Sequence, residues 1–256
     1  MDPLNFRENV LAGDKLIGTF LNTGSPALAE IAGCSGLDWC LIDMEHGSGS
    51  WESLASQMMA LGNSSIAPIV RLPAIDPVYF KKALDLGAWG LMIPNVNTVE
   101  EAQRAVAHSR FPPHGDRGVS SMNRSVRYGA LLDEQLKTAH LSTLIIAQIE
   151  SPLALGNAAS ISSTEGIDAL FVGPADLSVS MGIPKQFDHP DFLEAIDKTR
   201  DAAKENGKAS GILGFSNSDI QRYYDSGFNL VAIGSDAGMV AKGFKSLVAS
   251  SREYCH

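Results

Sequence analysis

The chain has 256 residues, 45% of them apolar, and a formal charge of −9. Its length is close to the roughly 250 residues of a single (β/α)8 barrel. No basic residues cluster, which argues against nucleic-acid binding, and no uncharged apolar run of about 18 residues predicts a membrane span. The N-terminal residues show no apolar signal-peptide core, so we expect a cytoplasmic protein.

Apolar, β-branched runs alternate with helical stretches along the whole chain. The runs predicted as strands are residues 16–21, 38–43, 66–71, 89–93, 144–149, 169–172, 209–213 and 229–234. Helices are predicted at residues 26–32, 51–61, 77–86, 99–109, 190–205, 217–226 and 238–250, and one more fits between the fifth and sixth strands.

This alternation favours one TIM barrel that spans residues 1–256 as a single domain. A doubly wound open sheet is the alternative, but it usually has fewer strands, and no G-x-G-x-x-G follows the first strand. The long connection at residues 111–128 has no predicted element, and such loops are usually functional or disordered. Because it follows the fourth strand, we expect it near the active face.

Three cysteines are present, Cys34, Cys40 and Cys255. Their number is odd and no pair has zinc-finger spacing. We expect all three to be reduced. Cys40 lies in an apolar run and is predicted to be a small buried side chain.

Acidic side chains follow the fifth and sixth predicted strands. Glu150 comes directly after the fifth strand, and Asp176 follows the sixth within Gly173-Pro174-Ala175-Asp176. Neighbouring parallel strands end on one face, so the two carboxylates should emerge side by side. Two close carboxylates repel unless a proton or cation separates them, and a hard divalent cation prefers such oxygen ligands. The ordinary alternative is two surface acids at loop starts.

Two further strand ends carry candidate catalytic groups. Arg71 ends the third strand and could bind an oxyanion in a planar fork. His46 is the only histidine at a strand end and could move protons near neutral pH. The alternatives are an ion pair of Arg71 with Asp43 or Glu45, and a surface position for His46. No lysine is predicted inside the barrel, which argues against Schiff-base catalysis.

Several motifs occur in order over nearly the whole chain: IDMEH (42–46), PIVRLP (68–73), FPPHGDRGV (111–119), AQIES (147–151), VGPADLS (172–178), GILG (211–214) and VAIGSD (231–236). Together they resemble the HpcH/HpaI family of metal-dependent, class II pyruvate aldolases. The resemblance implies a carbon–carbon lyase that cleaves or forms 4-hydroxy-2-oxo acids, giving pyruvate through its enolate, and an aldehyde.

The resemblance also implies roles for individual residues. Glu150 and Asp176 would hold one divalent cation, Mg²⁺, Mn²⁺ or Co²⁺. Arg71 would stabilise the enolate, His46 would act in acid/base chemistry, and Asp43 would orient this group. Substrate contacts are expected from Gln148, the amides of Gly173 and Ala175, and Leu213.

The family is typically a hexamer, a trimer of dimers, with the last helix exchanged between barrels. An acid from a neighbouring subunit pairs with the histidine, and Asp85 matches it here. Asp85 ends a predicted helix, at the bottom of its own barrel, so it would have to act across an interface.

Some positions depart from the family pattern. Met44 stands where a small residue is usual, Gly47-Ser48-Gly49 replaces Ala-Pro, and the first strand ends in Phe20-Leu21-Asn22. These residues are expected to line the aldehyde pocket, so the sequence leaves the identity of the acceptor aldehyde undetermined.

Two other functions remain as alternatives. One is a CoA-thioester lyase of the citrate-lyase β-subunit type, which would bind an anionic substrate tail near Arg117, Arg124 and Arg127. The other is a catalytically silent barrel that binds a metal or a 2-oxo acid.

Overall fold

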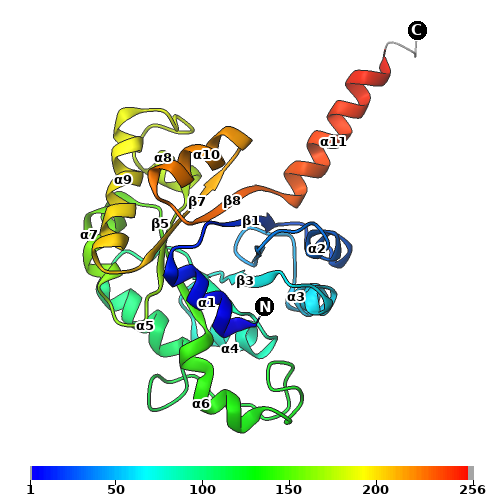
Figure 1. The fold of residues 1–256 in the computed structure, drawn as a ribbon, viewed down its shortest axis with the longest axis vertical. Helices are drawn as coiled ribbons and strands as arrows, with labels where there is room; N and C mark the ends of the chain where they lie inside the picture. Colours follow the sequence, from blue (N-terminus) through cyan, green and yellow to red (C-terminus); the bar gives the residue numbers. More distant parts are fainter. Residues whose placement is uncertain (1, 253–256) are drawn as a thin grey trace.

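The computed structural model describes residues 2–252 and forms a closed barrel of eight parallel strands, paired in sequence order from β1 to β8 and back to β1 (Figure 1). The predicted (β/α)8 fold is confirmed. The strands are β1 (Leu16–Leu21), β2 (Trp39–Asp43), β3 (Ala67–Arg71), β4 (Gly90–Ile93), β5 (Leu144–Ile149), β6 (Ala169–Val172), β7 (Ala209–Gly214) and β8 (Leu230–Ser235).

Helices surround the barrel, and most begin at a side-chain cap. Ser25, Thr98 and Ser151 each accept a hydrogen bond from a backbone N–H in the first helical turn. The α-helices are α1 (Pro3–Ala12), α2 (Pro26–Gly33), α3 (Trp51–Ala60), α4 (Pro77–Asp85), α5 (Val99–Ser109), α6 (Leu132–Ser142), α7 (Pro152–Ser162), α8 (Pro174–Ser180), α9 (Pro190–Glu205), α10 (Asn217–Ser226) and α11 (Asp236–Ser251).

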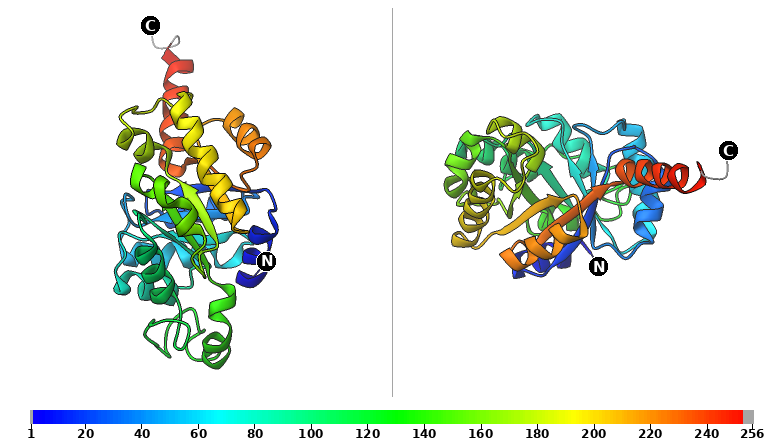
Figure 2. Two further views of the ribbon diagram at one scale, coloured as in Figure 1. Left: turned by 90° about the vertical axis from the view of Figure 1, so that its left-hand side faces the viewer. Right: turned by 90° about the horizontal axis from the view of Figure 1, so that it is seen from above.

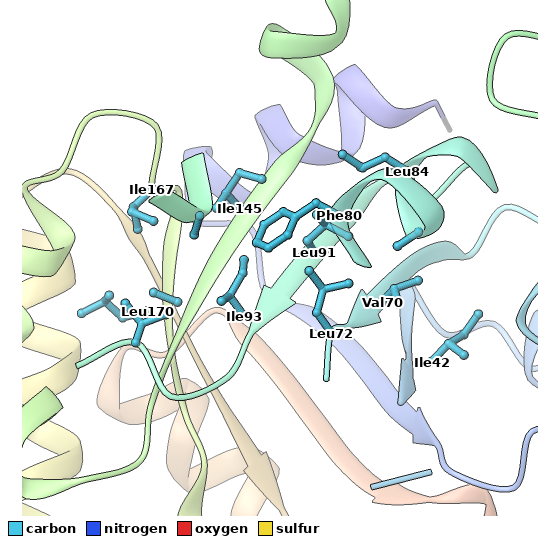
Figure 3. Packing of buried hydrophobic residues seen from close by; sticks show 14 of the residues in the cluster. Ile42, Val70, Leu72, Phe80, Leu84, Leu91, Ile93, Ile145, Ile167 and Leu170 are labelled. Atoms are coloured by element: carbon cyan, nitrogen blue, oxygen red, sulfur yellow. The ribbon is translucent and has the colours of Figure 1, made fainter. Parts of the chain in front are cut away.

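The main apolar core lies between the strands and the surrounding helices. Figure 3 shows its aliphatic side chains packed around Phe80 of α4, with Val70 and Leu91 contributed by neighbouring strands. All three side chains are fully buried. Because both faces of the sheet are covered, the strands are continuous apolar runs rather than alternating ones.

A second apolar cluster fills the barrel interior. It includes Trp39, Met92, Ile146 and Phe171 from four strands. Trp39 packs edge-on against Phe171, with ring centroids 6.2 Å apart. A Cβ at Gly18 would lie 2.3 Å from the Trp39 ring, so only glycine leaves room for this indole.

The long loop after α5 lies at the opposite end of the barrel from the strand C-termini, so the expectation that it borders the active face is wrong. Arg124 donates to the carbonyl oxygens of Leu86 at 3.0 Å and Met58 at 2.8 Å, and Ser125 N–H donates to that of Asp85 at 3.0 Å. These carbonyls are at the ends of α3 and α4. The loop follows α5 rather than β4, and α5 has already returned the chain to the end of the barrel where the strands begin.

Helix α11 projects away from the barrel (Figures 1 and 2). It contacts chiefly β1 and β8. Its outer residues Val240, Phe244, Leu247 and Val248 are all 40–66% exposed. Over residues 2–252, no helix is long and apolar enough to cross a membrane.

Candidate active site

A cavity of about 470 Å³ opens at the C-terminal ends of the strands. This is the face on which (β/α)8 barrels carry their active sites. Predicted site residues from five strands reach it. The lining includes His46, Arg71, Gln148, Gly173, Ala175, Asp176 and Leu213.

Glu150 follows β5 and is only 6% exposed beneath this cavity. Its Oε1 accepts a hydrogen bond of 2.7 Å from the backbone N–H of Asn95, and its Oε2 accepts one of 2.5 Å from Gln148 Nε2. Asn95 has a φ of 54°, a left-handed conformation that asparagine tolerates better than most residues. The loop after β4 therefore fixes the carboxylate that β5 supplies.

Three carboxylates interact electrostatically in this site. Burial, assisted by the charges of Glu45 and Asp176, raises the pKa of Glu150 from 4.5 to about 7. Burial also raises the pKa of Glu45, with a contribution from Asp176 and against the opposing charge of Arg71. The predicted pairing of Glu150 with Asp176 is consistent with this coupling, and Glu45 is an acid that sequence reasoning did not include among the metal-site residues.

The donor set at this cluster fits a hard divalent cation. Two buried oxygens at this cluster have no hydrogen-bond partner within the described residues: Oε2 of Glu45, one of the three carboxylates, and Oε1 of the Gln148 amide. Carboxylate and amide oxygens are the ligands that Mg²⁺ and Mn²⁺ prefer. Within residues 2–252 no group of three or more Asp, Glu, His or Cys side chains is arranged as a complete metal site.

Arg71 and Asp43 form a buried bidentate pair. Arg71 Nε lies 2.9 Å from Asp43 Oδ1, and Nη2 lies 2.7 Å from Oδ2. Burial opposes the ionisation of Asp43, but the hydrogen bonds and charge of Arg71 outweigh it and lower the pKa of Asp43. The Nε/Nη2 edge of the guanidinium is thus occupied, and Nη1 makes an ionic contact of 3.3 Å with Glu45. The sequence offered two alternatives for Arg71, a position in the site and an ion pair with Asp43 or Glu45. In the structure Arg71 both lines the cavity and pairs with these two acids.

His46 lies at the cavity mouth. Its side chain is 63% exposed, and its Nε2 is 3.8 Å from Glu45 Oε2. Its backbone N–H donates to Asp43 Oδ1 at 3.2 Å. Asn22, at the end of β1, donates from Nδ2 to the other Asp43 oxygen at 2.6 Å. Asp43 therefore orients the histidine loop as well as Arg71.

The turn from β6 into α8 borders the carboxylates closely. A Cβ at Gly173 would lie 2.6 Å from Gln148 Nε2 and 3.0 Å from Glu150 Oε2. The Gly173 N–H already donates to the Ile149 carbonyl at 3.3 Å. Of the two amides expected to hold a carboxylate, that of Ala175 is the better placed, because the first N–H groups of a helix have no intrahelical acceptor.

Not every predicted residue reaches this cavity. Asp85, the last residue of α4, lies at the other end of the barrel, where its Oδ1 accepts a hydrogen bond of 2.7 Å from Arg117. Met44 packs against the outer core instead of lining the cavity, whereas Phe20 and Asn22 do line it. The hydrogen bond of Asn95 to Glu150 depends on backbone conformation, and the sequence pattern gave no signal for it. Asn22 was expected to line the aldehyde pocket, but its hydrogen bond to Asp43 depends on the neighbouring strand and was not predicted.

Comparison with known proteins agrees with this geometry. The model of the HpcH/HpaI aldolase/citrate lyase family matches residues 16–243. The chain belongs to this family. It is accordingly a carbon–carbon lyase. It is 40% identical over 245 residues to a 5-keto-4-deoxy-D-glucarate aldolase of Salmonella arizonae, a match that covers 96% of this chain and 95% of the relative.

Solved structures of the family superpose closely. An HpcH/HpaI aldolase/citrate lyase family protein from Burkholderia cenocepacia is 34% identical, with a TM-score of 0.93 and coverage of 97% of this chain and 99% of that one. The citrate synthase SbnG is 29% identical, with a TM-score of 0.87 and coverage of 97% of both chains. The chain is thus similar in structure both to a protein titled as an aldolase/citrate lyase family member and to one titled as a citrate synthase.

Proposed function

We propose that this protein catalyses divalent-metal-dependent aldol cleavage and condensation of 4-hydroxy-2-oxo acids, giving pyruvate and an aldehyde. The observation that carries the proposal is the electrostatic coupling of Glu45, Glu150 and Asp176 next to Arg71, with Arg71 and Asp176 lining the cavity. Such a cluster is stable with a cation among the carboxylates, and the adjacent guanidinium can bind an oxyanion.

Glu150 and Asp176 are the residues that would hold the cation, with Mg²⁺, Mn²⁺ or Co²⁺ as candidates. When bound, a divalent ion supplies Lewis-acid stabilisation of negative charge on oxygen. In this proposal the buried Gln148 Oε1 and the backbone amide of Ala175 would contact the 2-oxo acid. Leu213 forms part of the apolar wall of the same cavity.

The remaining steps are assigned to side chains. His46 accepts the proton of the C4 hydroxyl through a water molecule, and the C3–C4 bond breaks as its electrons pass into the pyruvate enolate. Arg71, which lines the cavity, stabilises the enolate oxygen through the positive charge of its guanidinium. Return of a proton to C3 gives pyruvate and leaves the aldehyde. Condensation runs through the same steps in reverse.

The class of substrate that this protein cleaves is inferred from the name of a relative. The Salmonella protein is named for 5-keto-4-deoxy-D-glucarate, a six-carbon 4-hydroxy-2-oxo acid with a carboxylate at each end. We infer that this chain acts on the same class of sugar acid. Phe20 and Asn22, which line the cavity, are the departures from the family pattern that would adjust this preference.

The proposed assembly is a hexamer, a trimer of dimers, in which α11 is exchanged. The exposed stripe of Val240, Phe244, Leu247 and Val248 is unusual for a helix on a lone barrel and is consistent with burial against a second copy. Asp85 would then act on His46 of a neighbouring subunit. Mixing inactive His46→Ala and Asp85→Ala chains should restore part of the activity, because mixed interfaces would join an intact histidine with an intact acid.

A thioester-lyase function receives less support. Its anionic tail was expected near Arg117, Arg124 and Arg127, but that loop lies at the far end of the barrel. Arg117 pairs with Asp85, and Arg124 binds backbone carbonyls. These contacts are structural within one subunit.

Variants of the two ligands test the proposal. Glu150→Gln and Asp176→Asn should each weaken Mn²⁺ binding in calorimetry by at least tenfold and abolish pyruvate release, while Glu52→Gln, an exposed acid on α3, should change neither. Full metal affinity in both ligand variants would overturn the assignment. Metal binding in the wild type without turnover on any 4-hydroxy-2-oxo acid would instead favour a silent binding protein.

A further inference from the structure

One face of α11 borders the active-site cavity. Ser235, Gly238, Met239 and Lys242 line it, and their spacing of three, four and seven residues places them on one side of the helix. Lys242 is exposed, and among residues 2–252 it has no ion-pair or hydrogen-bond partner. Within the part of the chain that the structure describes, it is the only lysine that lines the cavity.

The charges of the cavity are unevenly distributed. Apart from His46, its charged lining residues are Arg71, Asp176 and Lys242. Arg71 is already paired with Asp43 at 2.7 Å and with Glu45 at 3.3 Å. The guanidinium of Arg71 is therefore already neutralised, whereas the ammonium on α11 forms no ion pair with any described residue of the lining.

Apolar side chains make up part of the cavity wall. They include Phe20, Leu213, Phe215 and Met239. A cavity of about 470 Å³ falls within the roughly 300–1,000 Å³ of small-molecule sites. A ligand whose 2-oxo acid end occupies the carboxylate and arginine end can therefore extend its other end along an apolar wall toward a free positive charge.

We infer that Lys242 is a specificity-determining residue that binds an anionic group, a carboxylate, at the aldehyde end of the substrate. This inference rests on the proposed aldol function, which places the 2-oxo acid at the inner end. Lys242 would thereby select dianionic 4-hydroxy-2-oxo acids over counterparts whose far end is neutral. A lysine suits this role because its long stem and mobile ammonium reach a carboxylate without fixed planar geometry.

The opposite side of α11 is compatible with the proposed assembly. At about 100° per residue, Val240, Phe244, Leu247 and Val248 lie roughly opposite the side that Ser235, Met239 and Lys242 share. A second copy that covers this apolar stripe leaves Lys242 on the cavity side. The two proposals about α11 therefore use different faces of the helix.

The test compares two condensations that differ only in the acceptor's terminal group. Pyruvate is combined with tartronate semialdehyde, which ends in a carboxylate, or with glyceraldehyde, which ends in a hydroxymethyl group. For Lys242→Met we expect kcat/KM to fall about tenfold with the first acceptor, mainly through KM. With glyceraldehyde it should stay within about twofold of wild type.

Three further variants sharpen this result. Lys242→Arg should keep the preference, and Lys242→Glu should reverse it. Lys204→Met removes the same charge from α9, outside the cavity lining, and should change neither reaction. An unchanged preference in Lys242→Met, or an equal loss with both acceptors, would overturn the inference and leave the proposed function standing. Failure of the wild type with both acceptors would overturn the two together.

Discussion

Arg71 and Asp43 hold each other through two hydrogen bonds, of 2.9 and 2.7 Å, between neighbouring strands of the barrel. The pair fixes the guanidinium of Arg71, which lines the cavity. The same Asp43 oxygen that binds Arg71 Nε also accepts hydrogen bonds from the backbone N–H groups of Glu45 and His46. One buried carboxylate thus connects the proposed oxyanion-binding group with the loop that carries the proposed base.

Loss of this arginine should affect catalysis more than binding. We expect Arg71→Ala to lower kcat for pyruvate release by about a hundredfold or more, because a fixed cation no longer stabilises the enolate. It also leaves Asp43 buried without its main partner, so Arg71→Lys is the companion variant that keeps a charge. Steady-state kinetics measures both. Turnover close to wild type in Arg71→Ala would exclude the proposed role.

Stability without metal should depend on pH through Glu150. Its pKa is raised from 4.5 to about 7 in the folded protein, so the folded state binds this proton more tightly than the unfolded state. The stabilising contribution of protonated Glu150 to the free energy of unfolding is fully present below about pH 4.5. It is lost as the pH rises to about 7, an effect on the order of 3 kcal/mol.

The matched variant for this measurement is Glu150→Gln, which cannot titrate. Unfolding by urea in EDTA, repeated across this pH range, gives the difference in free energy of unfolding between the two proteins. As the pH rises, we expect the free energy of unfolding of the wild type to fall relative to that of Glu150→Gln. Parallel stability curves would show that Glu150 titrates as an ordinary exposed acid.

Gly173 should tolerate no side chain. In Gly173→Ala the added Cβ would meet Gln148 Nε2 at 2.6 Å and Glu150 Oε2 at 3.0 Å, and these atoms belong to the proposed cation and substrate site. We expect activity to fall by at least tenfold with the fold intact, as seen by circular dichroism. Gly156→Ala in α7, where an added Cβ meets nothing within 4 Å, is the control and should gain up to about 1 kcal/mol of stability. Equal activity in the two variants would contradict the packing argument.

The exposed stripe on α11 should hold the subunits together. Phe244→Glu with Leu247→Glu places charges on its most exposed positions, and light scattering should then show smaller species than the proposed hexamer. Leu153→Glu changes a leucine on α7 that is 59% exposed and should leave the mass unchanged. A wild-type mass in the double variant would mean that α11 does not form the contact.

The sequence determined the strand pattern well because parallel strands covered on both faces are nearly continuous apolar runs. β1, β5 and β6 match their predicted bounds, and the strand ends identified Glu150, Asp176 and Arg71. Helices α1 and α6 were missed. The long loop was misplaced, because its position depends on a helix having first returned the chain to the other end of the barrel.

The contributions of other residues depend on tertiary geometry. Asn95 binds Glu150 through a left-handed backbone conformation, which periodicity and spacing do not predict. A contact of Glu45 with Arg71 was among the alternatives, but the coupling of Glu45 with Glu150 and Asp176 was not predicted. Similarly, Lys242 lies on an ordinary helical stretch in the sequence, and only the position of α11 brings it to the cavity.

The most direct test of the central claim is pyruvate release from 5-keto-4-deoxy-D-glucarate after EDTA treatment, and again after Mg²⁺, Mn²⁺ or Co²⁺ is restored. Cleavage that is lost on chelation and recovered with a divalent cation is the predicted result, since the proposed mechanism uses the cation to stabilise negative charge on the enolate oxygen. Cleavage that proceeds at the same rate in EDTA, with the metal shown to be removed, would contradict a metal-dependent aldolase.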